Sequence, residues 1–421
     1  LCLYVWNHLF KQVFVYAKWK EVEKMREVSR WRALAFIYFF MLAFALTFQG
    51  IPPVLGFIVS SLGISHAQAG TLMSFFGLPG IFISIPGGIL ADVYGSRYIG
   101  IVSLVITLVG SLLVGFGNSY FILVAGRIIS GIGALTIAII APRAVSQWFQ
   151  KEELGMAMGI FNTCMPLATI LTLNLFSRLA AFKGWRFPIL LTSFYCLLVF
   201  IMFYFKFPSS PGEKKQQEKS SFKKSLNGIR NTGLSVWLVA AIWMMYNASV
   251  ISYLTFGGDY YVSVGYSASY AGFLTSLLMI GSLLLSPLVG YLIDKVGKQE
   301  YIIAGSSVVL AALMFFVPRT ELNPLLLVIL IGIASPFVPA PVFSLVPKLL
   351  PPEKLGLGYG ILSTCLNVGV LIGPLMVGLS YDRTLSYLSG FNLMAIFALS
   401  TAIIAILFPF INKSAQIKEE S

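Results

Sequence analysis

Charged residues are scarce in this sequence. Asp, Glu, Lys and Arg make up 11% of its 421 residues, whereas hydrophobic residues make up 57%. A soluble protein carries about 25% charged residues. Apolar runs long enough to cross the roughly 30 Å hydrocarbon core of a bilayer recur along the chain. The shortage of charge excludes a soluble globular protein and predicts a chain whose main solvent is lipid.

The residues that most enzymes need are also scarce. The chain has two histidines, His8 and His66, and four cysteines, none of which has metal-ligand spacing. It has no Walker sequence for a nucleotide and no Ser–His–Asp candidate. We therefore expect no enzyme activity, no cofactor, no metal ion and no disulfide framework.

The net charge of +13 is concentrated in two basic runs, at 1–32 and 206–230. Nucleic-acid binding is one interpretation of such runs. The other is topology, because segments on the cytoplasmic side of a membrane protein are rich in Lys and Arg. We favour topology, and we expect a lipid bilayer and a small molecule as partners, but no nucleic acid.

An internal repeat organises the chain. The segments GGILADVYGSRY (87–98) and VGYLIDKVGKQE (289–300) share two glycines and an aspartate, and other matches at almost the same offset lie on both sides of them. The matching positions are Gly88, Asp92 and Gly95 in the first copy and Gly290, Asp294 and Gly297 in the second. An ordered series of matches predicts two copies of one module of about 200 residues.

Hydropathy predicts twelve spanning helices. We place them at about 33–61, 66–91, 98–117, 119–147, 156–180, 187–207, 235–257, 266–292, 300–318, 324–347, 357–381 and 387–411. The predicted divisions are a tail (1–32), a six-helix bundle (33–207), a cytoplasmic linker (208–234), a second bundle (235–411) and a short tail (412–421). Five cations lie on the side opposite to the termini, namely Arg178, Lys183, Arg186, Arg319 and Arg383. All the others except Arg127 and Arg143 lie on the side of the termini, which predicts cytoplasmic N- and C-termini.

Glycine and proline interrupt three of these helices: the first after Gly50, the fourth at Gly131 to Pro142 and the tenth at Pro336 to Pro341. A break inside a bilayer must be satisfied by neighbouring groups or by water. Helices beside a cavity provide such groups, so we expect the broken helices to line one. Kinking without any contact to a ligand is the alternative for each proline.

The pattern G-x-x-x-D-x-x-G-x-[RK], present twice, resembles the signature of the major facilitator superfamily, and the resemblance covers residues 33–411. It implies an all-α polytopic membrane protein with twelve transmembrane helices in two pseudo-symmetric six-helix bundles. It also implies a secondary transporter that works by alternating access, functions as a monomer and resides in the plasma membrane. A non-transporting membrane sensor is a remote alternative. The implied gating residues are Gly88, Asp92, Gly95, Arg97, Gly290, Asp294 and Gly297.

The segment LVAGRIISGIGAL (123–135) resembles the fourth-helix signature R-x-x-x-G-x-G of the same superfamily. Its Arg127 is a cation inside a span, which is costly in lipid. It either holds an anionic substrate or tunes a gate, or else it snorkels or bonds internal carbonyls. Arg143, 16 residues later, either reaches the headgroups or serves a cavity. The other candidate substrate-binding residues are Gln49, Asn162, Tyr246, Asn247 and Asn367, with hydrogen bonds between helices as the alternative role.

The predicted substrate is a small organic or inorganic anion. Arg127 has no acid in a neighbouring span to neutralise it, and residues 142–160 also resemble the corresponding region of organic-anion and nitrate/cyanate-type carriers. A neutral or amphipathic solute, such as a sugar or a drug, is the alternative. No Asp or Glu lies at mid-depth in a predicted span, where it would serve as a proton carrier. We therefore expect a facilitator, an exchanger, or a carrier in which the proton moves bound to the substrate itself.

Overall fold

Twelve helices long and apolar enough to span a membrane occur in the computed structural model, which describes residues 30–94, 96–149, 151–206, 232–350 and 355–420. Inside these ranges, 85–94, Arg143, Asp294 and a few other residues are described only by their helical backbone. Residues 1–29 of the predicted tail 1–32 and most of the linker 208–234 lie outside the described residues. The prediction of an all-α fold with twelve spans is confirmed.

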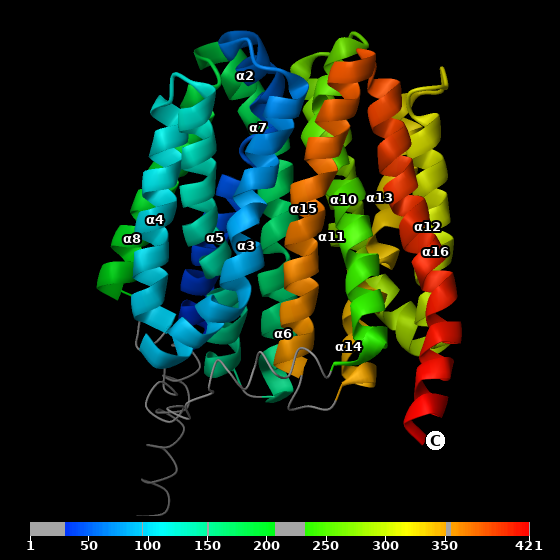
Figure 1. Cartoon of the computed structure of the whole chain (residues 1–421). Helices are drawn as coiled ribbons and strands as arrows, with labels where there is room; N and C mark the ends of the chain where they lie inside the picture. The colour runs from blue at the N-terminus through cyan, green and yellow to red at the C-terminus, as the bar shows by residue number, and fades with distance from the viewer. Residues whose placement is uncertain (1–29, 95, 150, 207–231, 351–354, 421) are drawn as a thin grey trace, which may run out of the picture.

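The first bundle contains six spans. They are formed by residues 30–49 with η1 (Pro52–Val54) and α2 (Leu55–Leu62), then α3 (His66–Tyr94), α4 (Ser96–Phe116), α5 (Tyr120–Trp148), α6 (Lys151–Asn162) with α7 (Cys164–Lys183), and α8 (Arg186–Lys206). We call the end of the molecule that holds the turns at 63–65, 117–119, 264–267 and 385–386 the upper end, as it is drawn in Figure 1. The opposite end is the lower end.

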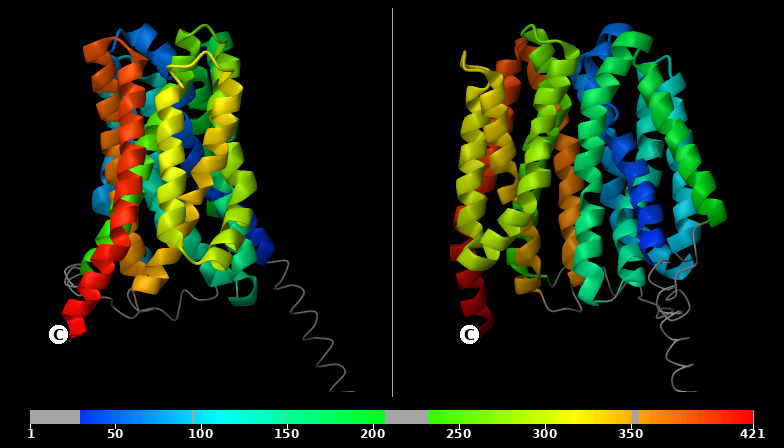
Figure 2. Two further views of the ribbon diagram at one scale, coloured as in Figure 1. Left: turned by 90° about the vertical axis from the view of Figure 1, so that its right-hand side faces the viewer. Right: turned by 180° about the vertical axis from the view of Figure 1, so that it is seen from behind.

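The second bundle repeats this plan beside the first (Figures 1 and 2). Its spans are α10 (Gly233–Ser263), α11 (Ala268–Val296), α12 (Gln299–Phe316), α13 (Pro324–Ala334) with η2 (Ser335–Phe337) and α14 (Pro339–Leu349), α15 (Leu355–Thr384) and α16 (Tyr387–Glu420). The turn after α11 needs its glycine, because Gly297 has a left-handed φ of 68° that disfavours other residues.

Proline breaks the first and the tenth spans, as predicted. Pro52 and Pro53 lie in the 3₁₀ segment η1, which interrupts the first span. In the tenth span Pro336 lies within the 3₁₀ segment η2, and Pro339 begins α14 just after it. The prediction of a break in the fourth span is wrong, because α5 runs unbroken through Pro142. Its glycines instead lie where a Cβ would collide with neighbouring backbone, at Phe76 for Gly131 and at Ser103 for Gly133. They bring α5 against α3 and α4.

The two bundles meet along two helix pairs: α3 packs on α15, and α7 packs on α11. Both pairs approach so closely that backbone touches backbone at a glycine. A Cβ on Gly70 would collide with the carbonyl of Pro374, and a Cβ on Gly272 with the carbonyl of Leu173. All four positions lie in the upper half of their helices. The bundles are therefore pressed together at the upper end.

Candidate functional site

Arg127 lies in α5, two turns below the upper end, with only 2% of its surface exposed. Its Nε donates to the carbonyl of Leu72 at 2.7 Å, and its Nη1 donates to the carbonyl of Thr47 at 2.8 Å. Its Nη2 donates to the carbonyl of Phe48 at 3.3 Å. The guanidinium carbon also lies 4.3 Å from the ring centre of Phe76, a cation–π distance. The side chain thus bonds internal carbonyls, which was one of the two roles predicted for it.

The break in the first span explains why these carbonyls need a donor. In a continuous helix the carbonyl of Phe48 would accept from the N–H of residue 52. Residue 52 is a proline and has no N–H, so this carbonyl needs a donor from elsewhere. Arg127 supplies it, and its fork-shaped guanidinium reaches the carbonyl of Thr47 as well. The cation of the fourth span therefore satisfies the break of the first.

A tyrosine plays the matching part in the second bundle. Tyr246 of α10 is 4% exposed, and its hydroxyl donates to the carbonyl of Ser335 at 3.0 Å and lies 2.7 Å from the Ser335 hydroxyl. Ser335 begins η2, the break in the tenth span. Each broken helix is thus bonded by a polar side chain from a neighbouring span, which is how a bilayer tolerates irregular backbone.

Most of the remaining candidate substrate residues are buried and bonded inside their own bundle. Gln49 donates to the Thr169 hydroxyl at 3.0 Å, and the amide groups of Asn247 and Asn367 donate to carbonyls one turn earlier in their own helices. Asn162, at the end of α6, is exposed. The side chain of Arg143 lies outside the described residues. None of these hydrogen bonds joins two of the candidate residues to each other.

The predicted gating residues lie at the lower end. Gly95 lies outside the described residues, and Gly88, Asp92 and Asp294 are described only by their helical backbone. Arg97 donates to the carbonyl of Tyr204 at 2.9 Å, within its own bundle. Gly297 makes the turn that ends α11, as the motif requires, whereas a Cβ on Gly290 would meet no atom within 4 Å.

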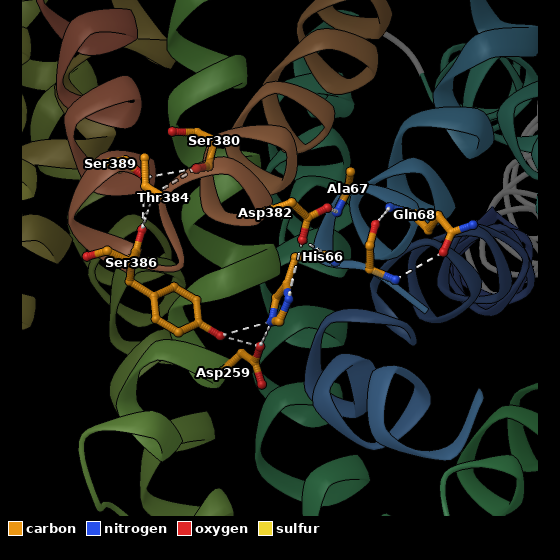
Figure 3. A network of polar contacts seen from close by, with 11 residues as sticks. His66, Ala67, Gln68, Asp259, Ser380, Asp382, Thr384, Ser386 and Ser389 are labelled. Carbon is orange, nitrogen blue, oxygen red and sulfur yellow. Dashed lines mark hydrogen bonds and ion pairs between the residues drawn. The ribbon is translucent and has the colours of Figure 1, made fainter. Parts of the chain in front are cut away.

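The upper end carries a polar network that the sequence analysis did not single out (Figure 3). His66, the first residue of α3, contributes its ring from the first bundle. Its Nε2 lies 3.3 Å from Oδ2 of Asp259 in α10, and its Nδ1 lies 3.8 Å from Oδ1 of Asp382 in α15. The Tyr387 hydroxyl donates to Asp259 at 2.5 Å. We call these four residues the upper network.

Asp382 also bonds the backbone of the opposite bundle. Its two carboxylate oxygens accept from the N–H groups of His66 at 2.9 Å and Ala67 at 2.7 Å. These are the first N–H groups of α3, which have no partner inside the helix, and the N-terminus of a helix favours a negative charge. Asp382 therefore caps α3 across the bundle interface. A signal was available in the sequence, because His66, Asp259 and Asp382 all end spans on the side opposite to the termini.

Two further contacts join the bundles near the upper end. Arg178 of α7 donates to the Ser269 hydroxyl of α11 at 2.6 Å, and the Asn174 amide donates to the Ser276 hydroxyl at 3.0 Å. Together with the upper network and the glycine contacts, they close the upper half of the interface. Separating the bundles at this end would break all of these contacts at once.

Comparisons with known proteins agree with this architecture. The family model of the Major Facilitator Superfamily matches residues 34–318 and 233–420. An uncharacterized MFS-type transporter of Methanocaldococcus jannaschii is 26% identical over 85% of this chain and 93% of its own length. A probable sulfoacetate transporter of Cupriavidus necator is 26% identical over 78% of this chain and 82% of its own length.

A lysosomal dipeptide transporter of Gallus gallus is 24% identical over 59% of this chain, and the match spans 59% of that relative's length. Among solved structures, the nucleoside transporter NupG superimposes with a TM-score of 0.72 at 15% identity, covering 90% of this chain and 99% of that one. At this identity the likeness concerns the fold alone.

Proposed function

Because the chain belongs to the Major Facilitator Superfamily and is a transmembrane transporter, we propose that it carries a small organic or inorganic anion by alternating access. The observation that supports this mechanism is the pair of six-helix bundles closed along α3–α15 and α7–α11 at the upper end. Rocking of one such bundle against the other exposes a site between them to one side at a time. The upper end is the part that must open for the other half of the cycle.

The charge of the substrate is proposed from Arg127. Within the described residues no Asp or Glu pairs with it, and the described acids lie near the ends of spans. Its donors face carbonyls, so it contributes a positive field rather than a direct contact, and such a field reaches far in a low-dielectric interior. A sulfoacetate transporter among the relatives carries an anion, which supports the same class of solute.

A neutral or amphipathic solute is the second candidate, and one observation favours it. All three nitrogens of the Arg127 guanidinium already donate to carbonyls. A substrate that needed this group for a direct ion pair would have to displace them. A dipeptide transporter among the relatives keeps a solute with no net charge within the range to be tested.

The gates and the orientation complete the proposal. We propose that Asp92 and Asp294, with the glycines of their motifs and Arg97, close the lower end when the upper end opens. The first span begins at the lower end, and α8 ends there before the basic segment 206–230, so we propose that this end faces the cytoplasm, with both termini on that side. The upper end then faces outside, the membrane is the plasma membrane, and one chain suffices for transport.

Flux into proteoliposomes tests transport and substrate class together. We expect uptake of a radiolabelled anion such as sulfoacetate, with competition by other small carboxylates and sulfonates, and weaker competition by dipeptides and sugars. A neutral solute that proves the best substrate would end the anion proposal but not the transport mechanism.

A locked variant provides the matched control. Asn174→Cys with Ser276→Cys, in a background without native cysteines, joined by a short thiol cross-linker, should stop flux, and reduction should restore it. The two side chains bridge the bundles at 3.0 Å, so a link holds the upper end shut. Full flux through the cross-linked protein would contradict alternating access at this interface.

A further inference from the structure

We propose that His66 binds a proton that strengthens closure of the upper end, so that acidity on that side holds the transporter closed there. This rests on the proposed alternating access, because it needs an upper end that opens. The observation that carries it is a histidine from one bundle placed between two aspartates of the other. Figure 3 shows the imidazole of His66 between Asp259 and Asp382.

The two ring nitrogens face two different carboxylates. Nε2 lies 3.3 Å from Asp259 Oδ2, and Nδ1 lies 3.8 Å from Asp382 Oδ1. A neutral imidazole has one N–H and one lone pair. Either tautomer therefore turns a lone pair toward one of the carboxylates. Only the protonated ring, with two N–H groups and a positive charge, suits both neighbours.

Partial burial makes this charge matter. The side chains of His66, Asp259 and Asp382 are 17%, 16% and 26% exposed. Opposite charges attract more strongly when water is partly excluded. Opening the upper end would separate His66 from both aspartates, because it belongs to the first bundle and they belong to the second. The attraction between a protonated His66 and the two aspartates therefore acts in the closed form and is lost in the open form.

The other titratable groups around His66 leave it as the group suited to respond near neutral pH. Tyr381 of α15 stacks on the ring with centres 3.9 Å apart, and the Tyr387 hydroxyl lies 3.4 Å from Nε2. Tyr120 of α5 bonds Thr71 one turn further along α3, and η1 and α2 contain no titratable residue. Tyrosines titrate near pH 10 and aspartates near pH 4, whereas histidines titrate at about 6.5.

Arg383, next to Asp382, is exposed and stays charged throughout this range. Tyr260 of α10 meets the Tyr387 ring edge to face, with centres 5.8 Å apart, and tyrosines do not titrate near neutral pH. A ligand that binds one state more tightly shifts the population toward that state. The proton acts here as such a ligand, taken up from the upper side and returned to the same side when that end reopens.

Thiol labelling of Ser276→Cys, in a background without native cysteines, measures opening of the upper end. Ser276 is fully buried at the bundle interface, and its hydroxyl accepts from Asn174 of the other bundle. A membrane-impermeant reagent added on the upper side reaches it only after the bundles separate. Because thiols react faster as the pH rises, each rate is divided by that of Leu322→Cys, an exposed position in an upper turn.

The normalised rate should be several-fold lower at pH 5.5 than at pH 7.5. His66→Gln should abolish this dependence and give the fast rate at both values. His66→Lys keeps a permanent charge and should give the slow rate at both. Ser269→Ala removes an interface bond that does not titrate, so it should speed labelling but keep the pH dependence.

Four results would overturn the proposal. If the His66→Gln variant keeps the pH dependence of labelling, a group other than His66 is responsible for that dependence. Faster labelling at pH 5.5 would reverse the sign of the effect. Labelling that depends on substrate but not on pH would leave alternating access intact and remove only the role of His66. Absence of labelling at every pH, with the Leu322→Cys reporter labelled normally, would overturn the proposed opening of this end as well.

Discussion

Arg127 has two possible roles, bonding carbonyls or holding an anion, and they predict opposite orders of activity for the variants Arg127→Gln and Arg127→Lys. In the structure the side chain donates to two carbonyls beside the break in the first span and to the carbonyl of Leu72 in α3. If that bonding is its role, Arg127→Gln should be better tolerated than Arg127→Lys. If the residue holds an anion through its charge, Lys should instead rescue part of what Gln loses.

The loss of stability expected for each variant follows from the hydrogen bonds that Arg127 makes. Glutamine has one amide group and keeps one of the three contacts, so two hydrogen bonds from a charged donor are lost, each worth about 1.5–3 kcal/mol. Against this, removing the buried cation recovers about 2.5–3.5 kcal/mol on insertion scales. The net loss for Arg127→Gln is about 1–3 kcal/mol. Lysine loses the fork-shaped contacts and keeps the cost of a buried charge, so its loss is larger.

The assay compares stability with transport in the same preparations. Thermal unfolding in detergent should rank wild type above Arg127→Gln and Arg127→Gln above Arg127→Lys, with shifts of a few degrees at about 2 °C per kcal/mol or less for a chain of this length. Flux per inserted protein should follow the same order. A wild-type melting temperature in both variants, with transport better in Lys than in Gln, would refute the structural role.

Two further predictions concern the interface and the second break. Gly70→Ala, which places a Cβ against the carbonyl of Pro374, should weaken closure of the upper end and speed external labelling of Ser276→Cys severalfold, whereas Gly305→Ala, where nothing lies within 4 Å, should leave labelling unchanged. Equal effects of the two alanines would argue against a tight α3–α15 contact. Tyr246→Phe should lower the free energy of unfolding by about 1 kcal/mol, because the Ser335 carbonyl loses the Tyr246 hydroxyl and keeps only the 3.4 Å bond from the Val338 N–H, while substrate affinity stays within about twofold. A large loss of affinity at unchanged thermal stability would instead place the Tyr246 hydroxyl on the substrate.

The number, order and approximate ends of the spans were predictable from the sequence, because hydropathy is a local property and lipid demands about 20 apolar residues for each crossing. Two of the three predicted helix breaks are present, in the first and tenth spans. They too have a local cause, because proline removes an N–H wherever it stands. Pro142 did not break α5, and the nearby glycines served helix packing instead. Sequence alone does not distinguish a glycine that weakens a helix from one that admits a neighbour.

The partners of the polar residues were decided by the tertiary structure. Arg127 was recognisable as a costly cation in a span, but its carbonyls belong to residues 55 to 80 positions away. The upper network joins residues separated by 128 to 321 positions, so no local pattern connects them. Composition and periodicity determine which segments enter the membrane, because each segment meets lipid on its own. Which side chains then meet depends on how the helices pack, and only the folded chain determines that.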